Sequence, residues 1–391
     1  MDRNTILERL NAPTMEERLA NLREIVAAET AAPEAKPQYA NNHIHTKFSF
    51  SPYSPTAAVY FARAEGLTSC GIMDHDSIGG AEEFRAAGAI AGMAITCGME
   101  VRTDWSMTPF GKVRLNNPDQ DGVAYMALHG VTKEATAPLQ AALAPYREAR
   151  NRRNRAMVEK INAIVAGSGI VLDFDADVIP LSWWNEGGSV TERHLLYALG
   201  EKVIEAVGME GVVDFVEQKL HLPLGEKQRA QLSDPSNPHF RYDLLGVFKA
   251  QLVEQMYIPA TDELISLPEV VKLADSLGIT LCYAYLGDVG NSVTGDKKTQ
   301  AFEDSYLDEL FEVLQQFGVK GVTYMPSRNT IEQMTRLQGL CRQYGMTEIS
   351  GEDVNSSRQS FICKQLELPQ FAHLVDATWK LIEIERGSAR A

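Results

Sequence analysis

Short apolar runs alternate with longer segments that carry apolar residues at helical spacing between residues 39 and 131. The short runs predict strands and the longer segments predict amphipathic helices, because side chains repeat every second residue in a strand and about every 3.6 residues in a helix. The predicted strands are 41–46, 68–75, 93–102 and 123–131, and the predicted helices are 54–67 and 79–92. Strand and helix in alternation, joined by short connections, indicate parallel strands in an α/β barrel or open sheet.

The pattern becomes mostly helical after Val131 and returns to alternation near residue 266. We therefore predict an α/β barrel or open sheet that a helical insertion interrupts, with one amphipathic helix and an Ala/Pro/Glu-rich linker before it. The expected division is 1–38 for the N-terminal helix and linker, 39–131 for the first part of the barrel, 132–265 for the helical insertion or subdomain, and 266–391 for the second part of the barrel and a C-terminal helix.

Composition narrows the classes of function. The chain has 391 residues, a net charge of −15 and 45% hydrophobic residues, and no apolar run approaches the length of roughly 20 residues that a membrane helix needs. Its acidity argues against a nucleic-acid polymer as partner, because binding to that polyanion depends on Lys and Arg. A small anionic substrate in a local basic pocket remains open. The five cysteines form no CxxC motif, and we expect a cytoplasmic protein with reduced thiols; oligomeric state is not indicated.

Histidines gather at the ends of the predicted strands. Four of the eight in the chain are placed there: His43, His45, His75 and His129. His43 and His45 form an HxH pair whose rings project to the same side of a strand. Glu100 and Asp353 also follow predicted strands and offer carboxylate oxygens. In an α/β barrel the carboxyl ends of the strands meet on the face that carries active sites, so these residues predict a metal site there.

Six segments resemble successive motifs of the polymerase-and-histidinol-phosphatase (PHP) family: NNHIHTKFSF, GIMDHDSIGG, CGMEVR, ALHGV, TERHLLYAL and SGEDVN. The resemblance implies a distorted seven-stranded (β/α)7 barrel whose carboxyl face holds up to three metal ions. By position in these motifs, the first ion would be bound by His43, His45, Glu100 and Asp353. Glu100 would bridge to a second ion that also takes His129.

Three positions depart from the family pattern. Tyr285 stands where the second site has a histidine, Phe50 replaces an aspartate of the third site, and Asn355 replaces a histidine of that site. The third site then keeps only His75. We expect one or two divalent ions (Mn, Zn or Fe), and Tyr285 is as well suited to orient water or substrate as to bind metal, because a neutral phenol is a poor ligand.

Candidate substrate and catalytic residues follow from the same resemblance. Arg193 and His194, at a predicted helix start, would meet a substrate phosphate, where backbone N–H groups also favour an anion. Arg102 and Arg328 are further candidates for phosphate recognition, with surface ion pairing as the alternative. His75, without its metal, would act as general acid or base or hold the substrate. For His194, packing beneath the insertion is an equal alternative.

The arginine-rich helix 146–160 is predicted to present a solvated basic face, although a similar helix contacts substrate in family members that act on nucleotides. Trp183 and Trp184, a little further along, are predicted to anchor packing in preference to stacking on a base.

The predicted function is a metal-dependent phosphoesterase, a phosphoric monoester hydrolase acting on a small phosphorylated metabolite or nucleotide through a metal-activated water. Two alternatives remain open: a metal-dependent hydrolase or lyase of a non-phosphate bond, and a regulatory module that keeps its ion without turnover.

Overall fold

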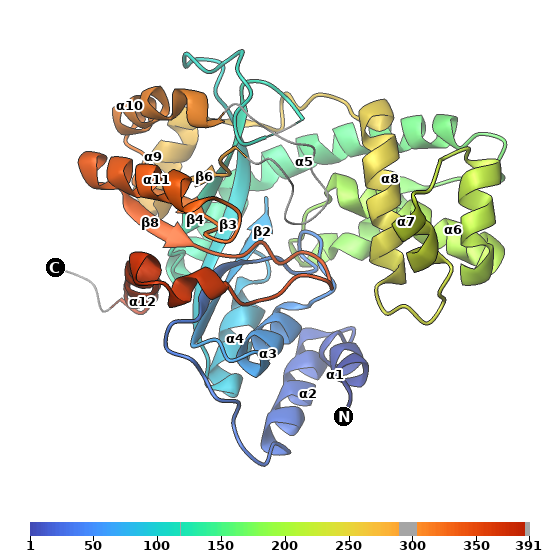
Figure 1. Cartoon of the computed structure of the whole chain (residues 1–391), viewed down its shortest axis with the longest axis horizontal. Coiled ribbons are helices and arrows are strands. Elements are labelled where there is room, and N and C mark those ends of the chain that lie inside the picture. Colours follow the sequence, from blue (N-terminus) through green and yellow to red (C-terminus); the bar gives the residue numbers. More distant parts are fainter. Residues whose placement is uncertain (118, 289–302, 388–391) are drawn as a thin grey trace.

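The computed structural model describes residues 1–117, 119–288 and 303–387 (Figure 1). Its strands are β1 Ala40–Ile44, β2 Ser69–His75, β3 Ala94–Asp104, β4 Val123–His129, β5 Ile265–Ser266, β6 Thr280–Tyr285, β7 Gly321–Tyr324 and β8 Thr347–Ser350. Its α-helices are α1 Arg3–Leu10, α2 Met15–Ala27, α3 Pro55–Ala64, α4 Ala81–Ala91, α5 Lys133–Ile164, α6 Glu192–Asp214, α7 Glu226–Leu232, α8 Phe240–Met256, α9 Leu267–Leu277, α10 Leu307–Phe317, α11 Ile331–Tyr344 and α12 Ala372–Glu385.

Seven strands form a curved sheet in the order β1-β2-β3-β4-β6-β7-β8, and the short β5 pairs with β3 beside this path. The two ends of the path meet just beyond β1 and β8. There His45 N donates to Val354 O at 3.0 Å and Val354 N donates to His43 O at 3.1 Å. The predicted seven-stranded α/β barrel is therefore confirmed, and its closure brings the HxH pair of β1 next to the segment that carries Asp353.

Strand β4 corrects the expectation of parallel strands. It pairs antiparallel with both β3 and β6, whereas the other pairs of the path are parallel. The connection from β3 to β4 contains no helix, and a strand pair joined without a crossover runs antiparallel. The end of β4 consequently points toward the opposite end of the barrel from the ends of β2 and β6.

Helices α3, α4, α9, α10, α11 and α12 surround the sheet, and apolar side chains of both layers form the main hydrophobic core. Helices α9 and α10 begin after polar residues and end at Gly278 and Gly318, which adopt the left-handed conformation that favours glycine. None of the helices in the described ranges is long and apolar enough to cross a membrane.

A second hydrophobic core lies between α5, α6, α7 and α8, which gather on one side of the barrel in Figure 1. Helix α5 joins the two cores, because Leu139 and Leu143 of its first half belong to the barrel core and Met157 and Ile161 of its second half belong to the other. Its buried residues recur every three or four positions along 32 residues, so one face of a single helix packs against both cores. We call residues 133–256 the helical insertion below.

The N-terminal segment forms two helices, α1 and α2, where one was expected. Pro13 and the capping box of Thr14 and Glu17 start a new helix there. Arg18 of α2 is completely buried, pairs with Glu83 of α4 at 2.6 Å and lies over the ring of Trp183 at 4.2 Å. This pair of helices is thereby bound to the barrel and to the loop 180–189 at the same time.

Candidate metal and substrate site

His45 is oriented by a chain of hydrogen bonds beneath the carboxyl face of the barrel. Its Nδ1 lies 3.3 Å from Ser49 Oγ, and Ser49 Oγ donates to Asp74 Oδ1 at 2.6 Å. Asp74 is completely buried and also accepts from the backbone N and the hydroxyl of Thr46, each at 2.6 Å. With Nδ1 protonated toward Ser49, Nε2 of His45 keeps its lone pair for an ion, as outer hydrogen bonds do for metal-binding histidines. Sequence reasoning missed the part of Asp74, although the residue stands beside His75.

Glu100 lies between two histidines. Its Oε1 is 3.0 Å from His43 Nε2, and its Oε2 is 3.1 Å from His75 Nδ1. The two oxygens of one buried carboxylate therefore face two different rings. His75 and Glu100 are direct partners across β2 and β3, so the sheet register itself sets them side by side.

Asp353, which follows β8 near the C-terminal end of the chain, joins the same cluster. Its Oδ1 lies 3.2 Å from His45 Nε2 and accepts from Asn355 Nδ2 at 2.5 Å. Asn355 therefore orients a carboxylate of the cluster. Donor atoms of His43, His45 and Asp353 lie within 4.8 Å of one another, as do those of His45, His75 and Glu100.

His129 ends β4, which runs antiparallel to its neighbours in the sheet. It pairs with Gly98, two residues before Glu100 on β3, and therefore shares the face of the sheet with Glu100. Its ring is buried, and Nε2 has no hydrogen-bond partner among the described residues. The expectation that every strand end lies at the carboxyl face does not hold for β4, whose direction is reversed, although both His43 and Glu100 act on the pKa of His129.

Electrostatics divide these groups into charged and neutral members. Burial alone would lower the pKa of His43, but Glu100 raises it to about 9. Burial would raise the pKa of Glu100, yet His43 and His75 hold it well below its usual value. Burial, with the charge of His43 nearby, lowers the pKa of His129 to about 3. The Glu100 carboxylate is thus ionised and His129 is neutral, which are the forms that bind metal, whereas His43 would release its proton on binding an ion.

These residues fit a divalent ion. Imidazole nitrogens and carboxylate oxygens are the usual donors for Zn, Mn and Fe. His75 Nδ1 approaches Glu100 without the alignment of a hydrogen bond, and His129 Nε2 is buried without a partner. Buried polar atoms are nearly always satisfied, so such atoms near an ionised carboxylate are suited to bind an ion.

Tyr285 does not join this cluster. Across the sheet, Ala284 continues the face of Cys282, Ala127 and Glu100, so Tyr285 projects to the outer face. Its hydroxyl donates to Asp304, which also accepts from Gln333 Nε2 at 2.6 Å. Burial and the Asp304 carboxylate raise the pKa of the phenol. The structure thus holds Tyr285 in a hydrogen-bond network outside the barrel mouth.

Phe50, which was expected to replace a third-site aspartate, lies in an aromatic cluster. Its ring contacts His194, Tyr197 and Tyr242, at centroid distances of 5.0, 5.6 and 5.8 Å. Phe50 belongs to the core of the helical insertion although it follows β1. Its side chain is thus a packing contact between barrel and insertion.

Arg193 and His194 lie in the first turn of α6, next to this cluster. His194 is completely buried, its Nδ1 accepts from Thr191 N at 3.0 Å, and burial and Arg150 lower its pKa to about 3. The neutral ring therefore carries its proton on Nε2, which has no partner in the described part of the chain. Arg193 is half-buried, has no ion-pair or hydrogen-bond partner among the described residues, and helps to hold the pKa of Asp353 low. The contact of His194 with Phe50 and its hydrogen bond from Thr191 N agree with the alternative prediction, in which His194 packs beneath the insertion.

Arg102 is tied into a buried network of charges, which we call the arginine network. Its members are Arg102 of β3, Arg150 and Arg153 of α5, Asp76 after β2, Glu192 at the start of α6 and Glu263 before β5. Arg153 Nε lies 2.6 Å from Glu263, and Arg150 Nη2 lies 3.0 Å from Glu192. The prediction of a solvated basic face is wrong for these two arginines, because carboxylates of the barrel and of α6 neutralise them in the interior.

The remaining predicted substrate residue, Arg328, is buried after β7, and its Nε donates to Leu286 O at 3.2 Å. The structure thus brings His43, His45, His75, Glu100 and Asp353 together, with His129 on the same face of the sheet as Glu100 and with Arg193 and His194 beside them. Arg102 instead forms ion pairs with carboxylates, and Arg328 donates a hydrogen bond to a backbone carbonyl. Sequence reasoning missed Glu263, which lies outside any motif, and Glu192, which stands in the TERHLLYAL segment beside Arg193 and His194.

The fold is an α/β barrel that two solved proteins share. It matches a protein from Bifidobacterium adolescentis assigned as a metal-dependent phosphoesterase, with a TM-score of 0.53 and 18% identity over 89% of this chain and 98% of that one. It also matches an amidohydrolase from Chromobacterium violaceum, solved with bound sulfate and no metal, with a TM-score of 0.54 and 17% identity over 87% and 96% of the two chains. At this identity the likeness concerns the fold.

Among curated proteins, a 5'-3' exoribonuclease of Haemophilus influenzae is 34% identical over 74 residues. The matched stretch covers 19% of this chain and 27% of that protein, so the chain spans about a quarter of the relative's length. No family model matches the sequence.

Proposed function

We propose that this protein is a metal-dependent phosphoesterase that hydrolyses a small anionic phosphoester with one or two divalent ions. The observation that carries the proposal is the convergence of His43, His45 and Asp353 with Glu100 and His75 within a few ångströms of each other. Beside them lies Arg193, which is half-buried, acts on the charge of Asp353 and forms no ion pair within the described ranges. The metal ligands and the anion-binding groups are thus neighbours.

A bound divalent ion would lower the pKa of a water molecule so that hydroxide is available near neutral pH. His43, His45, Glu100 and Asp353 would hold it. The reaction also needs groups that bind and orient the phosphate, and these belong to the chain itself.

Arg193 supplies the positive charge for the phosphate. It lies at the N-terminus of a 23-residue helix, where backbone N–H groups also favour an anion. The Nε2–H of His194 adds a neutral donor beside it, and because the pKa of this ring is about 3, that donor does not change with pH in the neutral range. His75 faces both Glu100 and the mouth of the barrel and is suited to metal or substrate contact. Arg102 has a structural part in this proposal, because Glu263 and Glu192 already neutralise it.

The test combines metal content with turnover in one preparation. Protein purified without chelator is analysed by elemental mass spectrometry and assayed on a panel of phosphomonoesters with and without added Mn²⁺. Asp353→Ala and His43→Ala should each lose metal and turnover, and Arg193→Ala should keep its metal and raise KM.

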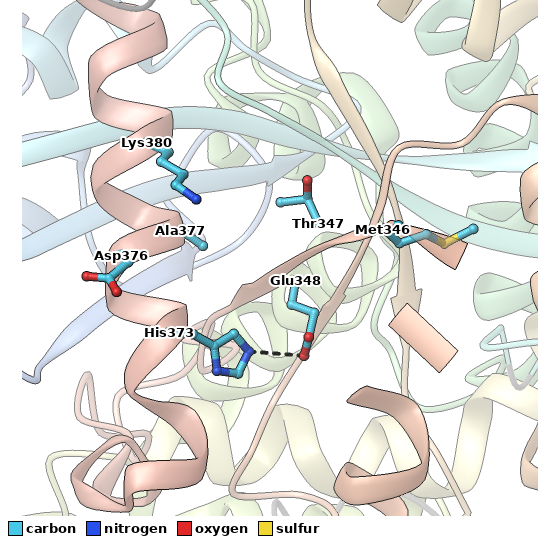
Figure 2. Close-up of a pocket in the computed structure, with 8 residues that line it drawn as sticks. Met346, Thr347, Glu348, His373, Asp376, Ala377 and Lys380 are labelled. Carbon is cyan, nitrogen blue, oxygen red and sulfur yellow. Dashed lines mark ion pairs between the residues drawn. The ribbon is translucent and has the colours of Figure 1, made fainter. Parts of the chain in front are cut away.

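His373→Ala is the matched control, because His373 also pairs with a carboxylate, Glu348, at 3.2 Å. Figure 2 shows this pair in a surface pocket between α12 and the beginning of β8, at the opposite end of that strand from Asp353. The control should retain both metal and turnover. Bound ions without cleavage of any phosphoester would reject the proposal and direct the search to other hydrolysable bonds, and a chain that binds no metal would remove its basis.

A further inference from the structure

We propose that a pocket between α4 and α12 binds a small monocarboxylate through Arg85, Glu385 and Arg386. Its lining residues and those of the candidate metal cluster are two separate sets. Glu385 reaches the sheet at Cys97, which is nearer the amino end of β3 than Glu100. The proposed binding site is therefore independent of the proposed hydrolysis at the carboxyl face.

The pocket has a volume of about 240 Å³ and lies where α4 and α12 both pack against β3. Pockets for drug-sized ligands have volumes of roughly 300–1,000 Å³, so this one suits a smaller molecule. Its walls combine three apolar side chains with three ionisable ones: Met93, Ile95 and Ile382, and Arg85, Glu385 and Arg386. A ligand with one polar end and a short apolar body matches this division.

Arg85 supplies a positive charge that no carboxylate of the described ranges neutralises at ion-pair distance. Its Nη1 donates to Thr136 Oγ1 at 3.2 Å and its Nη2 donates to Val131 O at 2.7 Å, and both acceptors are neutral. These two bonds hold the half-buried guanidinium in place and leave further N–H donors available. A fixed guanidinium of this kind is suited to bind a planar carboxylate through two parallel hydrogen bonds.

Glu385 supplies a neutral donor in the same pocket. Its Oε1 accepts from Cys97 N at 2.7 Å, whereas its Oε2 is buried and has no hydrogen-bond partner within the described ranges. Buried polar atoms rarely stay unsatisfied, so this oxygen indicates a missing partner. Burial raises the pKa of Glu385 to about 8, and the group is therefore mostly protonated at neutral pH. A protonated carboxyl group can donate to an anion, whereas an ionised one would repel it.

Charge and shape together select the class of ligand. At neutral pH the polar side of the pocket has two arginine cations, of which Arg386 is exposed, and one neutral donor. A single carboxylate can accept from the guanidinium of Arg85 and from the carboxyl group of Glu385. Met93 and Ile382 are 8% and 1% exposed, so the apolar walls lie in the interior and favour a short hydrocarbon chain. Inorganic phosphate would bring more charge and no apolar part.

Binding to this pocket should depend on pH through Glu385 alone. The ionisable groups that face Glu385 are Arg85 of α4, Cys97 of β3 and Arg386 at the end of α12. The two arginines stay charged, and burial raises the pKa of the Cys97 thiol well above its usual value, so it stays neutral. Affinity for a carboxylate should therefore be constant below neutral pH and fall about tenfold between pH 7 and pH 9, as Glu385 ionises.

Titration with butyrate, followed by ligand-observed NMR on the full chain, tests the proposal. Arg85→Gln should weaken butyrate binding by about tenfold or more, because it removes a charged donor. Arg386→Gln changes an exposed side chain, should weaken binding a few-fold, and serves if Arg85→Gln melts early by circular dichroism. Glu385→Gln keeps a neutral donor and should bind butyrate equally at pH 7 and pH 9. Arg193→Ala is the control for anion binding at the carboxyl face and should bind butyrate as the unaltered protein does.

Butyrate binding that is absent, unchanged in both Arg85→Gln and Arg386→Gln, or lost in Arg193→Ala would overturn the proposal. So would inorganic phosphate that displaces butyrate with equal affinity, because the apolar walls would then contribute nothing. An equal loss of affinity at pH 9 in Glu385→Gln and in the unaltered protein would contradict the part assigned to Glu385. Phosphoester turnover does not enter this test, so failure of the proposed function would leave the carboxylate site standing.

Discussion

Glu263→Gln should destabilise the protein strongly, because it removes one carboxylate from the interior of the arginine network. The Glu263 side chain is 1% exposed, and those of its partners Arg102 and Arg153 are 4% and 6% exposed. Removing one partner of a buried ion pair leaves an uncompensated charge and costs about 3–5 kcal/mol. Glutamine keeps the shape of the side chain, so the loss of stability measures the effect of removing the charge.

The chain offers a control pair whose two members are the sequence neighbours of Arg153 and Glu263. Arg152 and Asp262 join the same two segments at 2.6 Å, but their side chains are 65% and 63% exposed. An exposed pair of this kind contributes about 0–1 kcal/mol. Asp262→Asn should therefore have little effect.

Urea denaturation followed by circular dichroism measures both variants. The midpoint of Glu263→Gln should fall with an unchanged slope, and the additional substitution Arg153→Met should recover part of the loss, because it removes one unpaired cation. Equal midpoints for Glu263→Gln and Asp262→Asn would refute the reasoning that burial decides the value of these pairs.

Three further outcomes are expected. Ser49→Ala, which breaks the link between His45 and Asp74, should weaken metal affinity about 10–100-fold without unfolding the protein, as measured by competition with a metal-binding dye. Phe50→Ala should cost about 3–5 kcal/mol in thermal or urea unfolding, because it empties a packed aromatic site, and an unchanged melting temperature would contradict that packing role. Burial raises the pKa of Glu385 from 4.5 to about 8, so the unfolded chain loses this proton first and stability should fall as pH rises from 4.5 to 8. In Glu385→Gln the fall in stability should be smaller when denaturation is repeated across that pH range, because glutamine does not titrate. Its amide oxygen can still accept the hydrogen bond from Cys97 N.

Much of the fold could be predicted from the sequence because local patterns determine it. Alternating strands and helices predicted an α/β barrel or open sheet, the resemblance to the PHP family selected the barrel, and the loss of that alternation after Val131 indicated a helical region. The direction of β4 could not be read from its residues, since a mostly apolar run of seven fits either direction. That direction places His129 beside Gly98.

The candidate site likewise contains residues that a local pattern predicts and residues that it does not. Residues within motifs, such as His43 and Asp353, could be placed because the HxH spacing and the strand ends fix them. Whether a basic side chain is free or neutralised depends on partners far away in the chain, as with Arg153 and Glu263, which are separated by 110 positions. No local pattern contains that pairing, so the sequence alone predicts a solvated face for the arginines of α5.

The contact of Arg18 with Glu83 and Trp183 has a practical consequence for shortening the chain. A version that begins at residue 39 would lack α1 and α2, and Glu83 would keep only its bonds from Thr56 in a buried position. The indole of Trp183 would lose the guanidinium that covers it, in a loop whose Ser189 holds the carbonyl of His75. Trimming an apparently dispensable leading segment is therefore expected to loosen the entrance of the barrel, and soluble expression of the shorter form would be a poor guide to whether its site is intact.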